Sequence, residues 1–171
     1  KGLVTIQPRH GCFVNDYRTS GSAELLTSLW RHGDDEIEPA IVESVMEFRV
    51  TVEQEAAARI AGVVDTRTLK ELKAILDEGD TCPPNDTHRQ ADIDYRFHFA
   101  VALGSGNLIY PMVMNSFREI YLHLLRRFFS DQLVVERVRS LRRDLLTAIS
   151  RRDSDTARTV MRTLSEVSTY E

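Results

Sequence analysis

Apolar residues recur three and four positions apart through most of this chain, and this spacing is the strongest constraint on its fold. It matches the 3.6-residue period of an α-helix, which places such residues on one face. Six stretches of this kind follow one another along the chain, and they occupy residues 42–60, 69–76, 93–101, 109–128, 134–149 and 157–167. The sequence therefore predicts an all-α fold, an antiparallel bundle of six or seven helices.

Several residues mark where these helices start and stop. Asp65 and Asn107 each precede one of the stripes, where their side chains can cap the first helical turn. Pro39 fits only in the first turn of a helix. We expect a loop over residues 79–87, which contain two prolines, and one long helix over residues 109–128.

The first part of the chain follows a different pattern. Residues 3–14 contain two runs rich in β-branched residues on either side of a Pro-Arg-His-Gly turn signal. They predict a short β-hairpin, and the helical period begins only from Ser20. Two strands alone are marginally stable in water, so we expect this hairpin to pack against a further piece of protein.

Composition narrows the possible classes of protein. A chain of 171 residues is one ordinary domain, which can hold a core without a disulfide or a metal. A net charge of −4 excludes a uniformly basic nucleic-acid binder. No apolar run reaches the roughly 18 residues of a membrane span, so we expect no membrane partner.

The chain starts at Lys1, with neither a signal peptide nor an initiator Met, and we expect it to be the interior of a longer protein. Cys12 and Cys82 lie far apart in the sequence, without the paired spacing of a zinc or redox motif. We expect both to be free thiols in a cytoplasmic protein.

A few charged or ionisable residues interrupt the apolar stripes. Arg49 lies within the first stripe, at 42–60, and Arg142 lies within the stripe at 134–149. Asp94 and His98 are four positions apart and share one helical face. A charge on an apolar face is costly to bury unless it is paired, so groups from three helices could satisfy one another centrally. Helical bundles build ligand and metal sites in this way, and we predict an internal polar pocket.

Each of these residues has a plainer interpretation, which the sequence leaves open. Arg49 could pair with a core carboxylate such as Glu53. Asp94 and His98 could form an ordinary hydrogen bond between turns on a half-exposed face, and Arg142 could extend to solvent. A purely structural dimerisation bundle, whose polar groups only pair with each other, is therefore a further hypothesis.

Asp94 and His98 are also half of a plausible metal site. A carboxylate and an imidazole suit a divalent metal, but a firm site needs three or four ligands, which the sequence does not show. We therefore predict no cofactor and no enzyme. A metal-assisted hydrolase or metal-dependent sensor that uses these two residues is the alternative function.

Three groups of residues, taken in order, resemble the FadR branch of the GntR transcription regulators. They are Phe48-Arg49 with Val52-Glu53 and the alanines 56–58, then residues 94–98 with 103–107, and then residues 145–153 with 157–158 and 161–162. Residues 2–15 resemble the wing and exit of the family's winged-helix DNA-binding domain. This wing and residues 105–110 are most similar to the fatty-acid-responsive members.

The resemblance implies three parts, which are a wing remnant at residues 1–18, a linker helix at 19–34 and a helical effector-binding and dimerisation domain at 35–171. It implies a homodimer that binds operator DNA through a winged helix absent from this chain. Arg9 and His10 of the wing would contact the DNA. The effector would be a small anionic metabolite, either a carboxylic acid or a fatty acyl-CoA.

The resemblance also bears on the site. Many relatives hold a metal with one Asp and three His, of which Asp94 and His98 match two. The third position falls at Arg142 and the fourth near Leu164, so half of the ligand set is missing. Arg142 would then replace the ion as the positive charge. The implied ligand-binding residues are Arg49, Asp94, His98, Asn107 and Arg142.

Overall fold

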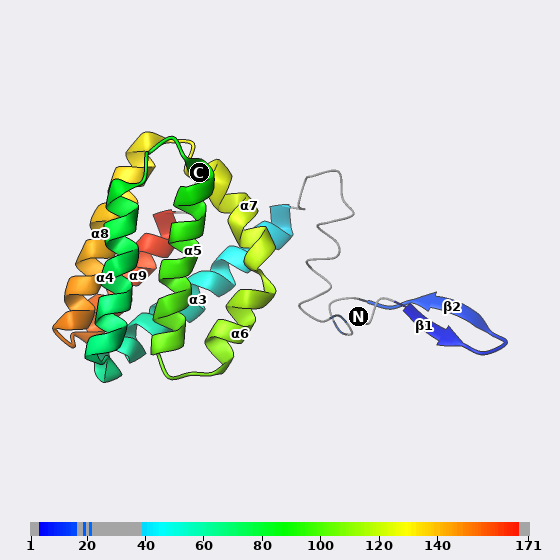
Figure 1. Ribbon diagram of the computed structural model, residues 1–171. Helices are drawn as coiled ribbons and strands as arrows, with labels where there is room; N and C mark the ends of the chain where they lie inside the picture. The colour runs from blue at the N-terminus through cyan, green and yellow to red at the C-terminus, as the bar shows by residue number, and fades with distance from the viewer. Residues whose placement is uncertain (1–3, 17–18, 20, 22–38, 168–171) are drawn as a thin grey trace.

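The computed structural model describes residues 4–16, 19, 21 and 39–167 (Figure 1). Strand β1 (Val4–Gln7) pairs antiparallel with β2 (Gly11–Val14), so that Val4 lies opposite Val14. The predicted hairpin is confirmed. The predicted linker helix at 19–34 lies outside the described residues, apart from 19 and 21, and the three-part division of the chain stays a prediction.

Seven helices make up the described residues 39–167, which confirms the predicted all-α bundle. They are α3 (Pro39–Val63), α4 (Thr66–Thr81), α5 (Thr87–Gly104), α6 (Ile109–Ser116), α7 (Arg118–Phe128), α8 (Gln132–Ser150) and α9 (Ser154–Val167). The predicted cap at Asp65 is present, because its side chain accepts a hydrogen bond from the Thr68 backbone N–H at 2.7 Å. The cap predicted at Asn107 is one residue out: Leu108 holds the cap position of α6, and Asn107 accepts a hydrogen bond from Ile109 N–H at 2.9 Å from the turn before it.

The long helix α3 runs across the bundle and packs along α9, while α4 lies beside α5 and α8 beside α9 (Figure 1). One contact fixes the end of α3 to the turn between α8 and α9. Arg152 in that turn has a positive φ of 58° and donates hydrogen bonds to the carbonyl oxygens of Gly62 and Val64, at 3.1 and 2.9 Å. These bonds satisfy carbonyls that a helix end leaves without a partner.

Helices α3 and α5 approach each other closely at Gly104, the last residue of α5. A Cβ atom at this position would overlap Cδ1 of Ile60 and lie 3.0 Å from Cγ2 of Thr68. Ile60 is fully buried, so its side chain has little room to move aside. The absence of a side chain at Gly104 therefore sets how closely these two helices can pack.

Two predicted boundaries are wrong. The helix expected over 109–128 is divided at Phe117, whose ring packs against Phe48 of α3 with centroids 6.0 Å apart. The loop expected over 79–87 covers only 82–86, because α4 continues to Thr81. Gly79 lies within the last turns of α4 and close to α5, since a Cβ there would be 3.4 Å from Cγ2 of Ile93.

Cys12 is exposed, Cys82 is buried, and both are free thiols, as predicted. Among the helices of the described part of the chain, none combines the length and the apolar character needed to cross a membrane.

Candidate functional site

Polar side chains from five helices meet in the interior of the bundle. Helical spacing places Arg49 and Glu53 of α3 one turn apart on the inward face. It places Asp94 and His98 of α5 in the same way. We call the group the ionic cluster, and its members are Arg49, Glu53, Asp94, His98, Tyr121, Arg142 and Ser165. Each member is at least nine-tenths buried.

Asp94 of α5 joins three helices. Its Oδ1 accepts a hydrogen bond from Nη2 of Arg142 at 2.5 Å, and its Oδ2 accepts one from the Tyr121 hydroxyl at 3.2 Å. Nη2 of Arg49 lies 3.7 Å from the same Oδ2. Burial by itself would raise the pKa of Asp94, but the charges of Arg142, His98 and Arg49 outweigh it and lower the pKa from 3.8 to about 2. Asp94 is therefore an ionised carboxylate at neutral pH.

Glu53 is a second buried carboxylate, and it joins α3, α5 and α9. It accepts hydrogen bonds from Nε of Arg49 at 2.8 Å and from the Ser165 hydroxyl at 2.7 Å. Nδ1 of His98 lies 2.9 Å from its Oε2, at an angle outside that of a regular hydrogen bond. Burial would raise the pKa of Glu53, but Arg49 and His98, together with the bond from Ser165, keep it below its usual 4.5.

The aromatic member of the cluster packs against one arginine. Cζ of Arg49 lies 4.3 Å from the centre of the Tyr121 ring, which is the distance of a cation–π contact. Burial, with the neighbouring carboxylates, raises the pKa of Tyr121 well above its usual 10. Tyr121 therefore stays neutral and serves as a hydrogen-bond donor to Asp94.

Arg142 of α8 is 1% exposed and is surrounded by apolar groups on the sides away from Asp94. Its Cζ lies 6.0 Å from the Phe97 ring centre and 5.9 Å from that of Phe129. Gly79 of α4 lies on another side of the guanidinium, where a Cβ would be at an ordinary contact distance of 3.7 Å from Nη1. Its Nε is buried and has no hydrogen-bond partner among the described residues.

The structure brings together four of the five predicted ligand residues, namely Arg49, Asp94, His98 and Arg142. The fifth, Asn107, is half-buried in the loop between α5 and α6, where its hydrogen bonds serve the turn. The predicted pairing of Arg49 with Glu53 is present. The alternatives that placed Arg142 in solvent and the Asp94–His98 pair on a half-exposed face are wrong.

Arg9 and His10, the predicted DNA-contacting residues, lie at the exposed turn of the hairpin. Arg9 has a positive φ of 69°, and Nδ1 of His10 lies 3.1 Å from the Pro8 carbonyl oxygen. This conformation is unusual for a residue other than glycine, and it presents the arginine at the tip of the turn.

Sequence reasoning missed two members of the ionic cluster. Tyr121 lies in the apolar stripe at 109–128 and Ser165 in the stripe at 157–167, and the helical spacing assigns neither of them a polar role. The Tyr121 hydroxyl was a usable signal, because a buried phenol normally finds a hydrogen-bond partner. Ser165 stands beside Leu164 on α9 and carries no comparable signal, since only the packing of α9 on α3 brings it to Glu53.

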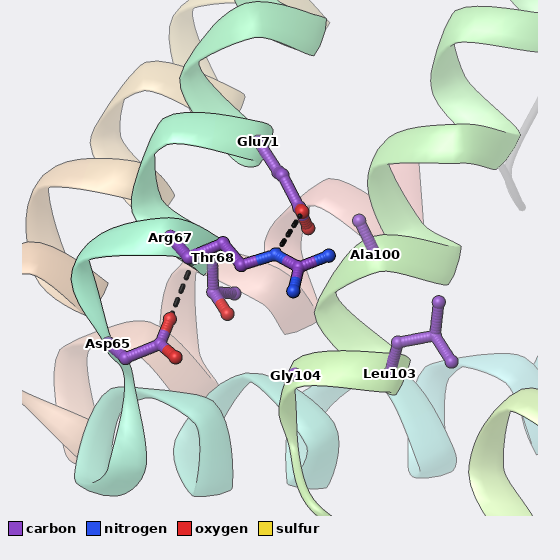
Figure 2. A pocket seen from close by; sticks show the side chains of 7 residues that line it. All are labelled: Asp65, Arg67, Thr68, Glu71, Ala100, Leu103 and Gly104. Atoms are coloured by element: carbon purple, nitrogen blue, oxygen red, sulfur yellow. Dashed lines mark hydrogen bonds and ion pairs between the residues drawn. The ribbon is translucent and has the colours of Figure 1, made fainter.

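A pocket of about 260 Å³ lies away from the ionic cluster, between the start of α4 and the end of α5 (Figure 2). It is lined by Asp65, Arg67, Thr68, Glu71, Ala100, Leu103 and Gly104. Figure 2 shows Arg67 turned toward Glu71, and the Nε–Oε1 distance is 3.1 Å. Both side chains are more than half exposed, so this pair is a weak surface interaction. The pocket contains none of the predicted site residues.

The ionic cluster does not suit a divalent metal. Guanidinium groups from two arginines approach Asp94, and a positive charge there opposes the binding of a cation. Within residues 4–16 and 39–167, no group of three or more His, Cys, Asp or Glu side chains is placed to hold a metal ion. The arrangement can instead hold an anion, and it gives no support to the hydrolase alternative.

Comparison with known proteins places the chain in a family. Residues 15–170 match the family model described as the FadR C-terminal domain. The chain is 27% identical over 130 residues to the fatty acid metabolism regulator protein of Edwardsiella ictaluri, which covers 76% of this chain and 52% of that protein. It is 22% identical over 154 residues to that of Proteus mirabilis, which covers 90% and 62%. The chain thus spans about half the length of the curated relatives it matches.

A solved structure supports the same fold. Streptococcus agalactiae GntR matches with a TM-score of 0.69 and 16% identity, over 97% of this chain and 73% of that one. At this identity the likeness concerns the fold alone. The family model covers nearly the whole chain, and the chain belongs to the FadR C-terminal domain family.

Proposed function

We propose that this chain is the effector-binding and dimerising part of a ligand-responsive transcription regulator. Its family and the names of its relatives support this proposal. The observation that carries the binding function is the ionic cluster, in which two arginines lie in the interior of the bundle. The cluster joins five helices and buries charges from three of them, which offers an anion a site where solvent screening is weak.

The proposed effector is a small anionic metabolite, either a carboxylic acid or a fatty acyl-CoA. Arg142 and Arg49 supply the positive charge, and a guanidinium can hold a carboxylate or a phosphate through two parallel hydrogen bonds. Asp94 and His98 line the same position. Asn107 contributes if the ligand extends from the cluster toward the loop between α5 and α6.

The proposed output is control of operator DNA by a homodimer of the intact protein. The hairpin is proposed to be the wing of a winged-helix domain, with Arg9 and His10 toward the DNA. An arginine at an exposed tip suits a phosphate contact, which positions a protein on DNA without reading sequence. The effector changes DNA binding to the extent that it binds one conformation of the dimer more tightly than the other.

Arg142→Ala tests the site. Removal of this guanidinium should weaken binding of sodium octanoate or octanoyl-CoA by about 1.5–3 kcal/mol, the range for a hydrogen bond to a charged group. Isothermal titration calorimetry measures the affinity, and circular dichroism checks that the variant is folded.

Arg143→Ala is the matched control for this experiment. Arg143 is the next residue of α8, is 54% exposed and pairs with Asp80 at the surface. Its removal should leave the affinity unchanged. Equal affinities for the wild type and Arg142→Ala would remove Arg142 from the site.

A further inference from the structure

The guanidinium of Arg142 uses only one of the two donors, Nε and Nη2, on one of its hydrogen-bonding edges. Nε and Nη2 of an arginine point to the same side and together match the two oxygens of a carboxylate. Here Nη2 donates to Oδ1 of Asp94, whereas the buried Nε has no partner among the described residues. A buried donor without a partner is costly, so this edge has an unused capacity for an acceptor oxygen.

Asp94 is not free to satisfy both donors. Its second oxygen, Oδ2, accepts the hydrogen bond from Tyr121 and lies 3.7 Å from Nη2 of Arg49. One oxygen of the carboxylate thus contacts α8, and the other contacts α3 and α7. A carboxylate without these other attachments could take Nε and Nη2 together, and would make one more hydrogen bond to Arg142 than Asp94 does.

These contacts point to an exchange. We propose that Asp94 is an internal competitor for the effector's anion site, so that an incoming carboxylate takes the Nε–Nη2 edge of Arg142 and releases Asp94 from it. This inference rests on the proposed function and specifies how the same site is regulated. Asp94 keeps its contacts with Tyr121 and Arg49 after the exchange.

The exchange has a defined structural consequence. The Asp94–Arg142 pair links α5 to α8, whereas the contacts of Arg49, Glu53 and His98 link α3 to α5 and α9. Release of Asp94 breaks the first link and leaves the others in place. Helix α8 can then move relative to α5, and the two states differ in which carboxylate is paired with Arg142.

Asp94→Asn tests the exchange, with sodium octanoate as the probe and calorimetry as the measurement. Asparagine keeps the shape of the side chain and an oxygen for the Tyr121 hydroxyl, but it carries no negative charge to compete for Arg142. The variant should bind octanoate at least about tenfold more tightly than the wild type, because ion-paired hydrogen bonds contribute about that much. Asp92→Asn is the control, since Asp92 lies on the same helix, is 45% exposed and pairs only with surface arginines.

Arg142→Lys tests the edge itself. Lysine keeps the positive charge but has no forked pair of donors, so the affinity for octanoate should fall at least about tenfold if both donors are used. Circular dichroism checks that each variant is folded. An affinity equal to that of the wild type would show that charge alone binds the probe, and it would overturn the proposed edge.

The outcomes separate this inference from the function on which it rests. If the wild type binds octanoate, Arg142→Lys does not and Asp94→Asn binds no more tightly than wild type, the exchange is wrong and the anion site stands. If binding survives both Arg142→Lys and Arg142→Ala, the site and the exchange both fail. No binding by any of the chains contradicts carboxylate sensing and the exchange with it.

Discussion

At the scale of single residues, the ionic cluster shows how a bundle can bury charge. Asp94 and Glu53 each accept hydrogen bonds from at least two side chains, and two arginines balance the two carboxylates. A buried ion is costly unless it is paired and hydrogen-bonded, and loss of one partner leaves an uncompensated charge. The inward position of Arg49 and Arg142 is therefore tied to the presence of the carboxylates opposite them.

The lowered pKa of Asp94 predicts acid sensitivity. Because the folded-state value of about 2 lies below the ordinary 3.8, the ionised carboxylate stabilises the fold fully above about pH 4 and loses that contribution as the pH falls toward 2. The loss from Asp94 should be about 2 kcal/mol, and Glu53 adds to it in the same direction. Urea unfolding between pH 7 and pH 2 measures this decline.

Two variants assign the decline to its source. Asp94→Asn should show a shallower fall in the free energy of unfolding between pH 4 and pH 2, because it has no carboxyl group to protonate at this position. Asp92→Asn should keep the profile of the wild type. A profile for Asp94→Asn that parallels the wild type over the whole range would show that Asp94 is not the titrating group.

At the scale of elements, sequence periodicity predicted most helices, and tertiary contacts decided the exceptions. The cap at Asp65 follows from local chemistry, so it was predictable. The break at Phe117 has neither glycine nor proline and coincides with packing against Phe48. The loop predicted from residue 79 begins only at 82, because α4 continues through Gly79 to Thr81.

Gly104→Ala should loosen the crossing of α3 and α5. The added Cβ meets the buried Ile60 and the side chain of Thr68, so the free energy of unfolding should fall by about 1–3 kcal/mol, the usual cost of overpacking. Gly62→Ala is the control on α3, where a Cβ would have only one neighbour, Oγ of Ser154 at 4.0 Å.

The control should behave in the opposite sense. Alanine is favoured over glycine within a helix by roughly 0.5–1 kcal/mol, so Gly62→Ala should be neutral or stabilising. Urea unfolding of both variants provides the comparison. If Gly104→Ala is as stable as the wild type, the space at this position does not limit the packing of the two helices.

At the scale of the whole molecule, the described residues combine a helical bundle with a short hairpin. Specific protein–DNA interfaces bury roughly 1,000 Å² or more of protein surface and read base edges from a helix or a ribbon in a groove. A hairpin with two four-residue strands offers much less. The 171-residue chain alone should therefore bind operator DNA no more tightly than the micromolar range of non-specific contacts.

A mobility-shift assay with the isolated chain checks this expectation, and it should be run at two salt concentrations because non-specific binding weakens steeply with salt. Arg9→Ala should reduce any residual binding without changing its sequence preference, as expected for a phosphate contact. Nanomolar affinity for one operator sequence would contradict the prediction.

The sequence by itself determined the helical bundle, the hairpin, the free thiols and the places of Arg49, Asp94, His98 and Arg142 on apolar helical stripes. It did so because these features depend on local spacing and on the solvation of single side chains. Only the tertiary structure decided that the four residues meet and that Glu53, Tyr121 and Ser165 form hydrogen bonds within the same cluster. It also decided that Asp94 binds only one donor of the Nε–Nη2 edge of Arg142. Contacts between helices depend on how the helices cross, and a one-dimensional pattern does not specify those angles.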